Sequence, residues 1–124
     1  WLRVNSNCTA INVAQQKEDE GSLLSWYKKL IQLRKTTPQL LGGTFKLLYK
    51  DKHIYSYQRS LTSLSDSSEK IAVVVLNYSP KHKSYPPALA QRLKSLQDAR
   101  ILASVYPCTD TLPPYAAFIL EAVI

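Results

Sequence analysis

The 124-residue sequence predicts a mainly β fold, with one N-terminal α-helix followed by a small antiparallel β-sandwich. One segment near the N-terminus, from Ser22 to Pro38, has a strong helical period. After Pro38, short runs of β-branched and aromatic residues alternate with turn-forming residues, as in a sheet of short strands. The hydrophobic content of 45% and charged content of 20% are those of a globular chain. The length leaves room for one domain, or for one element and one small domain.

The predicted helix has an apolar stripe at helical spacing. This stripe consists of Leu23, Trp26, Leu30 and Leu33, and it is widened by Tyr27 and Ile31. Ser22 is a candidate N-cap, because a short side-chain oxygen can accept from the free N–H groups of the first turn. The acidic run at 18–20 also marks the start, and Pro38 marks the end. The sequence before Glu18 shows no period and predicts an irregular lead-in.

Two strands are expected directly after the helix. The segment 40–43 ends in two glycines and predicts a turn. Thr44 to Lys50 and His53 to Ser60 read as strands, and the short link between them predicts a β-hairpin. A loop rich in serine is expected at 61–68.

The strongest strand signal lies between Lys70 and Tyr78. Every residue from Ile71 to Leu76 is apolar, which is typical of a strand that is covered on both faces. We interpret Asn77 as a turn residue that ends this strand. Beyond it the sequence predicts a short helix at 88–97, strands at 101–106 and 115–123, and loops that contain proline at 79–87 and 107–114. About five strands with turns at short intervals predict the sandwich.

Charge and cysteine content favour no special partner. The net charge is +7, but the 16 lysines and arginines are dispersed, which indicates a solvated surface. A nucleic-acid-binding protein is the alternative, and it would bind any duplex in a salt-dependent way. The two cysteines, Cys8 and Cys108, could pair because their number is even, but two thiols make no disulfide framework, and free thiols in a reducing cytosol are expected. No apolar run approaches the roughly 20 residues of a membrane-spanning helix, and no membrane partner is expected.

No catalytic, cofactor-binding or metal site is predicted. The acidic run at 18–20 is assigned to a helix cap, and Asp51, Asp66, Asp98 and Asp110 fall in predicted turns. Glu69 borders a strand and Glu121 lies within one. His53 and His82 are far apart in sequence and have no Ser or Cys partner in a known motif. Three glycines are too few for a phosphate-binding loop.

The helical segment resembles the last barrel helix of glycoside hydrolase family 13, the α-amylase superfamily. The similarity is greatest to its α-glucosidase, oligo-1,6-glucosidase and trehalose-6-phosphate hydrolase group. The matching residues are Ser22, Leu23, Leu24, Trp26, Tyr27, Lys28, Lys29, Leu30, Ile31, Leu33, Arg34, Lys35, Pro38 and Leu40. The segments 1–7 and 11–13 are similar to family segments at compatible spacing, although family prolines are missing at Arg3 and Ser6. Val-Val-Leu-Asn-Tyr-Ser at 74–79 also resembles the family.

The resemblance implies two regions. Residues 1–38 would be the end of the catalytic barrel, and residues 39–124 would be the C-terminal β-sandwich. The apolar stripe of Leu23, Trp26, Leu30 and Leu33 would dock on the barrel, and Trp1 would lie near the wall of the substrate pocket. The parent would be a retaining α-glucosidase that acts on oligosaccharides. Such enzymes need a nucleophile and a general acid at the ends of barrel strands.

Those catalytic motifs are absent from this sequence, so the chain alone is expected to be inactive. The parent's own barrel is the expected partner, and the isolated chain is expected to self-associate. One alternative is a carbohydrate-binding or interaction module, in which Tyr55, Tyr57, Tyr78 and Tyr85 would stack on sugars. Another is the same region of a non-catalytic relative, such as the heavy chain of an amino-acid transporter.

Overall fold

The computed structural model describes residues 2–64, 67–96, 98–107 and 109–124. The chain divides into two compact units, the first ending at Thr36 and the second running from Thr37 to Ile124. Three predictions lie outside the described residues. These are the wall contact of Trp1, the turn at Asp66 and the free thiol of Cys108. The helix predicted at 88–97 is wrong at its end, because α4 (Pro87–Lys94) stops at Lys94 and Ser95 is its C-cap.

The first unit contains two helices, α1 (Val13–Glu18) and α2 (Leu23–Thr36). The irregular lead-in predicted before Glu18 is therefore wrong at α1. Asn12 starts this helix, because its side-chain oxygen accepts a hydrogen bond from the Gln15 N–H at 2.9 Å. Six residues are fewer than two turns, so α1 is too short to produce a readable period.

Helix α2 has the predicted cap and end. The Ser22 hydroxyl oxygen accepts from the Ser25 N–H at 3.2 Å and donates to the Gln16 carbonyl at 2.7 Å, which joins α1 to α2. The helix stops at Thr36, two residues before Pro38. The acidic run does not cap it, because Glu18 ends α1 and the Asp19 carboxylate accepts from the Gly21 N–H at 2.8 Å.

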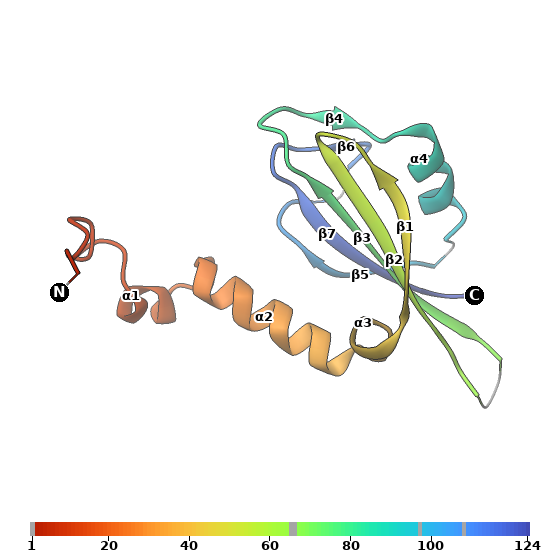
Figure 1. Cartoon of the computed structure of the whole chain (residues 1–124), viewed down its shortest axis with the longest axis horizontal. Coiled ribbons are helices and arrows are strands. Elements are labelled where there is room, and N and C mark those ends of the chain that lie inside the picture. Colours follow the sequence, from red (N-terminus) through yellow and green to blue (C-terminus); the bar gives the residue numbers. More distant parts are fainter. Residues whose placement is uncertain (1, 65–66, 97, 108) are drawn as a thin grey trace. The chain divides into compact units, whose positions relative to one another are not determined.

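The second unit is built on a five-stranded antiparallel sheet in the order β1-β2-β3-β7-β5 (Figure 1). The strands are β1 (Thr44–Lys50), β2 (Ile54–Thr62), β3 (Glu69–Asn77), β5 (Arg100–Ser104) and β7 (Ala117–Val123). These ranges confirm the predicted hairpin and the five predicted strands to within two residues at nearly every end. β3 also ends at Asn77 as predicted.

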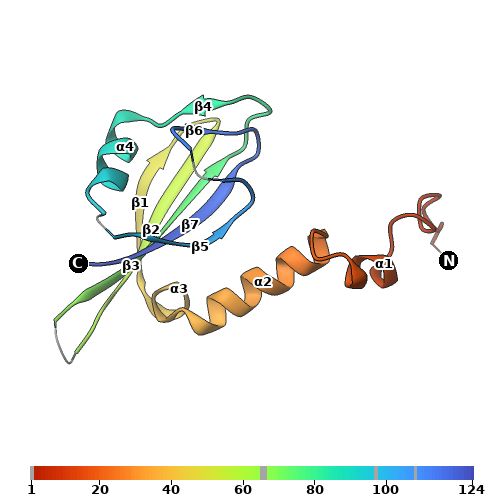
Figure 2. The same ribbon diagram turned by 180° about the vertical axis from the view of Figure 1, so that it is seen from behind.

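One face of the sheet, called the inner face, carries the core. It is covered by α4 (Pro87–Lys94) and by a second small sheet of β4 (Lys83–Ser84) and β6 (Thr111–Leu112). In both views these elements lie together at the end of the sheet away from α3 (Pro38–Gly42) (Figures 1 and 2). The core consists of Ile54, Ile71, Val73, Val75, Leu89, Leu96, Leu112, Phe118 and Ala122.

Three short elements lie where turns or loops were expected. α3 replaces the turn at 40–43, and β4 and β6 lie within the two proline-containing loops. Pro38 occupies the first position of α3, where its fixed φ favours a helix and its missing N–H costs nothing. The prediction treated this proline only as the end of the preceding helix. β4 and β6 have two residues each, which is below the length of any strand pattern.

Candidate functional site

The opposite face of the sheet, called the outer face, is apolar but only partly covered. The register between strands places Phe45, Leu47, Tyr55, Tyr57, Val74, Leu76 and Ile119 on this face. We call these seven residues the outer patch. Phe45 and Leu47 keep 54% and 47% of their surface exposed, whereas Val74 is buried between its neighbours. The most exposed side chains of the patch therefore lie at the β1 edge.

Three aromatic rings form a row within the outer patch. The ring centroids of Phe45 and Tyr57 are 5.3 Å apart, and those of Tyr57 and Tyr55 are 5.9 Å apart. Both pairs are tilted rather than face to face, as aromatic contacts usually are. The row lies across two neighbouring strands, so its rings are held by the rigid sheet.

The other end of the outer face is covered by α3. Gln39 is fully buried there, and its side-chain nitrogen donates to a Glu121 carboxylate oxygen at 2.6 Å. The other Glu121 oxygen accepts from the Arg100 guanidinium at 2.5 Å. Burial raises the pKa of Glu121, but the hydrogen bonds from Gln39 and Arg100 and the nearby positive charge outweigh it, so the pKa lies below its ordinary value.

The structure puts only two of the four candidate stacking tyrosines together. Tyr55 and Tyr57 are neighbours on the outer face, whereas Tyr78 follows β3 and is exposed. Tyr85 packs on the inner side, with its ring 6.4 Å from that of Phe118 in an edge-to-face contact. Sequence reasoning did not identify Phe45, although its apolar character at the start of a predicted strand was a usable signal.

The apolar stripe predicted on the helix lies on α2. Leu23 is 66% exposed, and Trp26, Leu30 and Leu33 are half-buried. Tyr27 and Ile31, which widen the stripe, are exposed. The Lys29 ammonium lies 5.5 Å from the centre of the Trp26 ring, close enough for a cation–π contact. No residue of α2 is buried, and its most accessible apolar side chains are Leu23, Tyr27 and Ile31.

Two carboxylates with shifted pKa values have structural partners. Asp51 accepts from the backbone N–H groups of His53 and Ile54 at 2.7 and 2.6 Å, and these bonds hold its pKa below the ordinary value. Glu121 is shifted in the same direction. A general acid in a retaining glycosidase needs the opposite shift. Among the described residues, no group of three or more His, Cys, Asp or Glu could hold a metal ion.

The described helices include none that is long and apolar enough to cross a membrane.

Comparison with known proteins finds several relatives of similar sequence. No protein-family model matches the chain. Over 79 residues it is 43% identical to a probable oligo-1,6-glucosidase 2 of Bacillus subtilis (strain 168). This alignment covers 59% of this chain and 14% of that protein. Over 120 residues it is 31% identical to an α-glucosidase of Candida albicans. This alignment covers 94% of this chain and 19% of that protein.

Solved structures show the same fold. The trehalulose synthase MutB from Pseudomonas mesoacidophila MX-45 superposes with a TM-score of 0.74 at 25% identity, over 100% of this chain and 22% of that chain. The isomaltulose synthase PalI from Klebsiella sp. LX3 gives a TM-score of 0.74 at 24% identity, over 100% of this chain and 22% of that chain. The chain spans about a fifth or less of the curated relatives it matches. It therefore corresponds to a C-terminal part of an α-glucosidase-like protein of glycoside hydrolase family 13.

Proposed function

We propose that this chain packs against the catalytic barrel of a retaining α-glucosidase and stabilises it, while the barrel hydrolyses α-glucosidic bonds in oligosaccharides. One observation carries the proposal. β3 is apolar and largely buried on both faces, as in a strand that is covered on both sides, but beside it the β1 edge of the outer patch leaves Phe45 and Leu47 about half exposed. A surface of this kind in a soluble protein marks an interaction site.

The second unit offers the outer patch as its docking surface. The chain enters this unit at Thr37, and α3 follows directly on the outer face, where Gln39 contacts Glu121. The polypeptide therefore arrives on the side of the sheet that carries the outer patch.

The first unit offers the α2 stripe. Leu23, Trp26, Leu30 and Leu33 lie on one face of α2, and Leu23 is largely exposed. Burying such a leucine is worth roughly 2 kcal/mol. In the proposal this face docks on the barrel, and the isolated chain has no glycosidase activity because the nucleophile and the general acid belong to the barrel.

A chimera tests the docking role. The corresponding C-terminal part of the Bacillus subtilis oligo-1,6-glucosidase is replaced by this chain, and the melting temperature and the hydrolysis of isomaltose are measured. We expect an active, folded chimera. Leu47→Lys in the outer patch should lower its melting temperature by several degrees, because a charge would be buried against the barrel.

Val105→Lys is the matched control, since Val105 is exposed to a similar extent, 45% against 47%, and lies outside the outer patch. Equal melting temperatures for the Leu47→Lys and Val105→Lys chimeras would contradict docking through the outer patch. The gene sequence upstream of Trp1 tests the parent's activity. A barrel with an Asp nucleophile, a Glu acid and a third Asp supports a glycosidase, and a barrel without them indicates a non-catalytic relative.

The aromatic row favours a second candidate function, a carbohydrate-binding surface. Phe45, Tyr57 and Tyr55 would present ring faces to a sugar chain. Titration of the chain with maltose and isomaltose, followed by tyrosine and tryptophan fluorescence, tests this candidate. A response that Tyr57→Leu abolishes would support it, and no response would remove it.

We also infer a cytoplasmic location. The support is Cys8, which is an exposed free thiol, as is typical of reducing compartments. Fractionation of the source cells tests the location, and recovery of the parent outside the cytoplasm would contradict it.

A further inference from the structure

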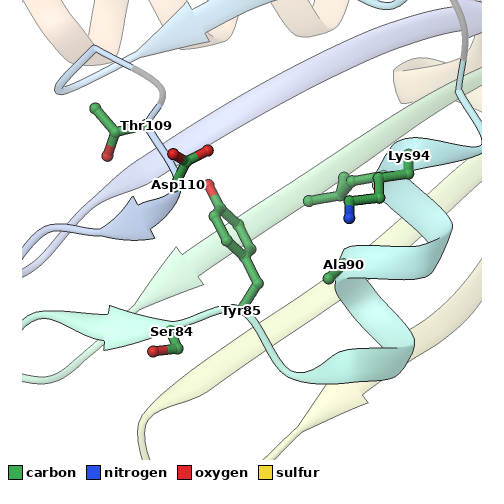
Figure 3. Close-up of a pocket in the computed structure, with 7 residues that line it drawn as sticks. Ser84, Tyr85, Ala90, Lys94, Thr109 and Asp110 are labelled. Atoms are coloured by element: carbon green, nitrogen blue, oxygen red, sulfur yellow. The ribbon is translucent and has the colours of Figure 1, made fainter.

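A groove lies on the inner side of the second unit, away from the outer patch. It has a volume of about 520 Å³ and is lined by Ser84, Tyr85, Ala90, Leu93, Lys94, Thr109 and Asp110. These residues come from β4 and the link that follows it, from α4 and from the segment that leads into β6 (Figure 3). The volume falls in the range of small-molecule sites in proteins.

The floor of the groove is apolar, and the Tyr85 ring that forms part of it is held in place. Tyr85, Ala90 and Leu93 supply the apolar surface. Tyr85 and Leu93 also pack against the buried core, and the edge-to-face contact with Phe118 orients the Tyr85 ring. A ring that is already ordered loses little conformational entropy when a ligand binds. The groove therefore provides a preformed aromatic surface.

The rim of the groove is polar and carries both signs of charge. Ser84 and Thr109 contribute hydroxyl groups, Asp110 a carboxylate and Lys94 an ammonium group, and all four residues are exposed. In the view of Figure 3 the Tyr85 ring is drawn between Asp110 and Lys94. Within the described part of the chain, neither charge forms an ion pair. Both groups are therefore available to donate to, or accept from, a ligand.

These features select one class of ligand. Opposite charges in one small site disfavour a strongly anionic or cationic ligand, because one of the two would repel it. A ligand with hydroxyl groups can accept from Lys94 and donate to Asp110 at the same time. An aromatic floor favours a ligand with an apolar face. A pyranose sugar combines these properties.

We infer that this groove binds a glucosyl unit of an α-linked oligosaccharide. The choice of α-linked glucose rests on the proposed function, whereas the choice of a pyranose rests on the groove itself. A single sugar unit in an open groove binds weakly, with a dissociation constant on the order of 1 mM. Such a site would hold a substrate chain near the enzyme.

The test is an NMR titration of the full 124-residue chain, labelled with ¹⁵N, using maltose, isomaltose and the β-linked disaccharide cellobiose. We expect saturable chemical-shift changes at Tyr85, Lys94, Asp110 and their neighbours with the two α-linked sugars. Lys94→Ala and Asp110→Ala should each weaken binding about tenfold, the value of one hydrogen bond to a charged group. Because both side chains are exposed, the folded state should be retained.

Lys81→Ala is the matched control, since Lys81 is another exposed lysine and does not line the groove. Tyr85→Leu keeps an apolar contact in the core but removes the ring, so it should weaken binding while the spectrum stays folded. Absence of saturable shifts, shifts confined to the outer patch, or equal weakening by Lys81→Ala would each overturn the site. An equal response to cellobiose would overturn the α-linkage and with it the link to the proposed function, but it would support a pyranose site.

Discussion

At the scale of single residues, Asn77 ties three segments of the second unit together. Its side-chain nitrogen lies within hydrogen-bonding distance of the carbonyls of Lys81, Leu112 and Pro113, at 3.0, 3.2 and 2.7 Å. Its oxygen accepts from the Ser79 N–H at 2.9 Å. The sequence predicted only the end of a strand at this residue. Leu112 and Pro113 lie 35 and 36 residues further along, so no local pattern could reveal them as partners.

Replacing Asn77 should be costly. Asn77→Ala leaves buried carbonyl groups without donors, and we expect the free energy of unfolding to fall by about 3 kcal/mol. Urea denaturation followed by circular dichroism measures this change. Asn5→Ala, at an exposed asparagine in the first unit, is the control and should change the free energy by less than about 0.5 kcal/mol. If the two variants unfold at the same urea concentration, the role assigned to Asn77 is wrong.

Glu121 should make stability depend on pH. Its pKa in the folded chain lies below the ordinary value of 4.5, so folding favours the ionised carboxylate. The stabilisation is complete above about pH 4.5 and is lost as the pH falls through the lower, folded pKa. Glu121→Gln should therefore unfold with a flatter pH dependence below this value. Urea midpoints measured at several pH values test this, and Glu20→Gln, at an exposed carboxylate, should retain the wild-type slope.

At the scale of elements, two adjacent glycines after α2 have different roles. A Cβ atom on Gly43 would lie 2.5 Å from the Gln39 carbonyl oxygen and 2.7 Å from that of Ser60, both of them backbone atoms. A Cβ atom on Gly42 would meet nothing within 4 Å. The close approach at Gly43 lets α3 lie against the start of the β1–β2 hairpin. This packing, and not turn geometry, is the reason for a glycine there.

The pair gives a matched prediction. Gly43→Ala should lower the free energy of unfolding by about 2 kcal/mol or more, because the backbone of α3 or β2 must move. Gly42→Ala should be neutral or stabilising by about 0.5 kcal/mol, because alanine favours a helix and the unfolded chain becomes less flexible. Thermal unfolding of both variants tests this. A smaller loss for Gly43→Ala than for Gly42→Ala would contradict the close packing of α3.

The long elements could be predicted from the sequence, and the short ones were missed. β2 and β3 have nine residues each, β2 alternates and β3 is apolar from Ile71 to Leu76, and α2 repeats its stripe over several turns, so all three were found. α1 and α3 have six and five residues, and their starts depend on Asn12 and Pro38. A cap or a first-position proline is a local signal that a search for periodicity overlooks. The same limit applies to the two-residue strands β4 and β6.

At the scale of the whole molecule, only one of the two candidate surfaces, the α2 stripe, could be predicted from the sequence. The α2 stripe follows from spacing within one helix, so it could be listed residue by residue. The outer patch depends on the register between β1 and β2, in which Leu47 opposes Tyr57, and on the bulge next to Leu47. Pairing between strands is non-local, so only its consequence was predicted, namely that β3 would be covered on both faces.

These two apolar surfaces predict how the isolated chain behaves in solution. Because Leu23 of the α2 stripe and Phe45 and Leu47 of the outer patch are exposed, the chain should self-associate as its concentration rises, since burying these side chains releases water. Size-exclusion chromatography with light scattering measures the mass. Leu23→Lys and Leu47→Lys should each shift the chain toward the monomer, and the double variant should shift it furthest.

Val105→Lys adds the same charge to an exposed valine outside both surfaces and separates the effect of position from that of net charge. Since the chain already carries a charge of +7, a further lysine anywhere increases repulsion between copies. The apolar surfaces are therefore responsible for association only if lysine at Leu23 or Leu47 lowers the measured mass more than lysine at Val105 does. A wild-type chain that stays monomeric at high concentration would mean that these surfaces do not drive association, and docking on a barrel would lose its main support.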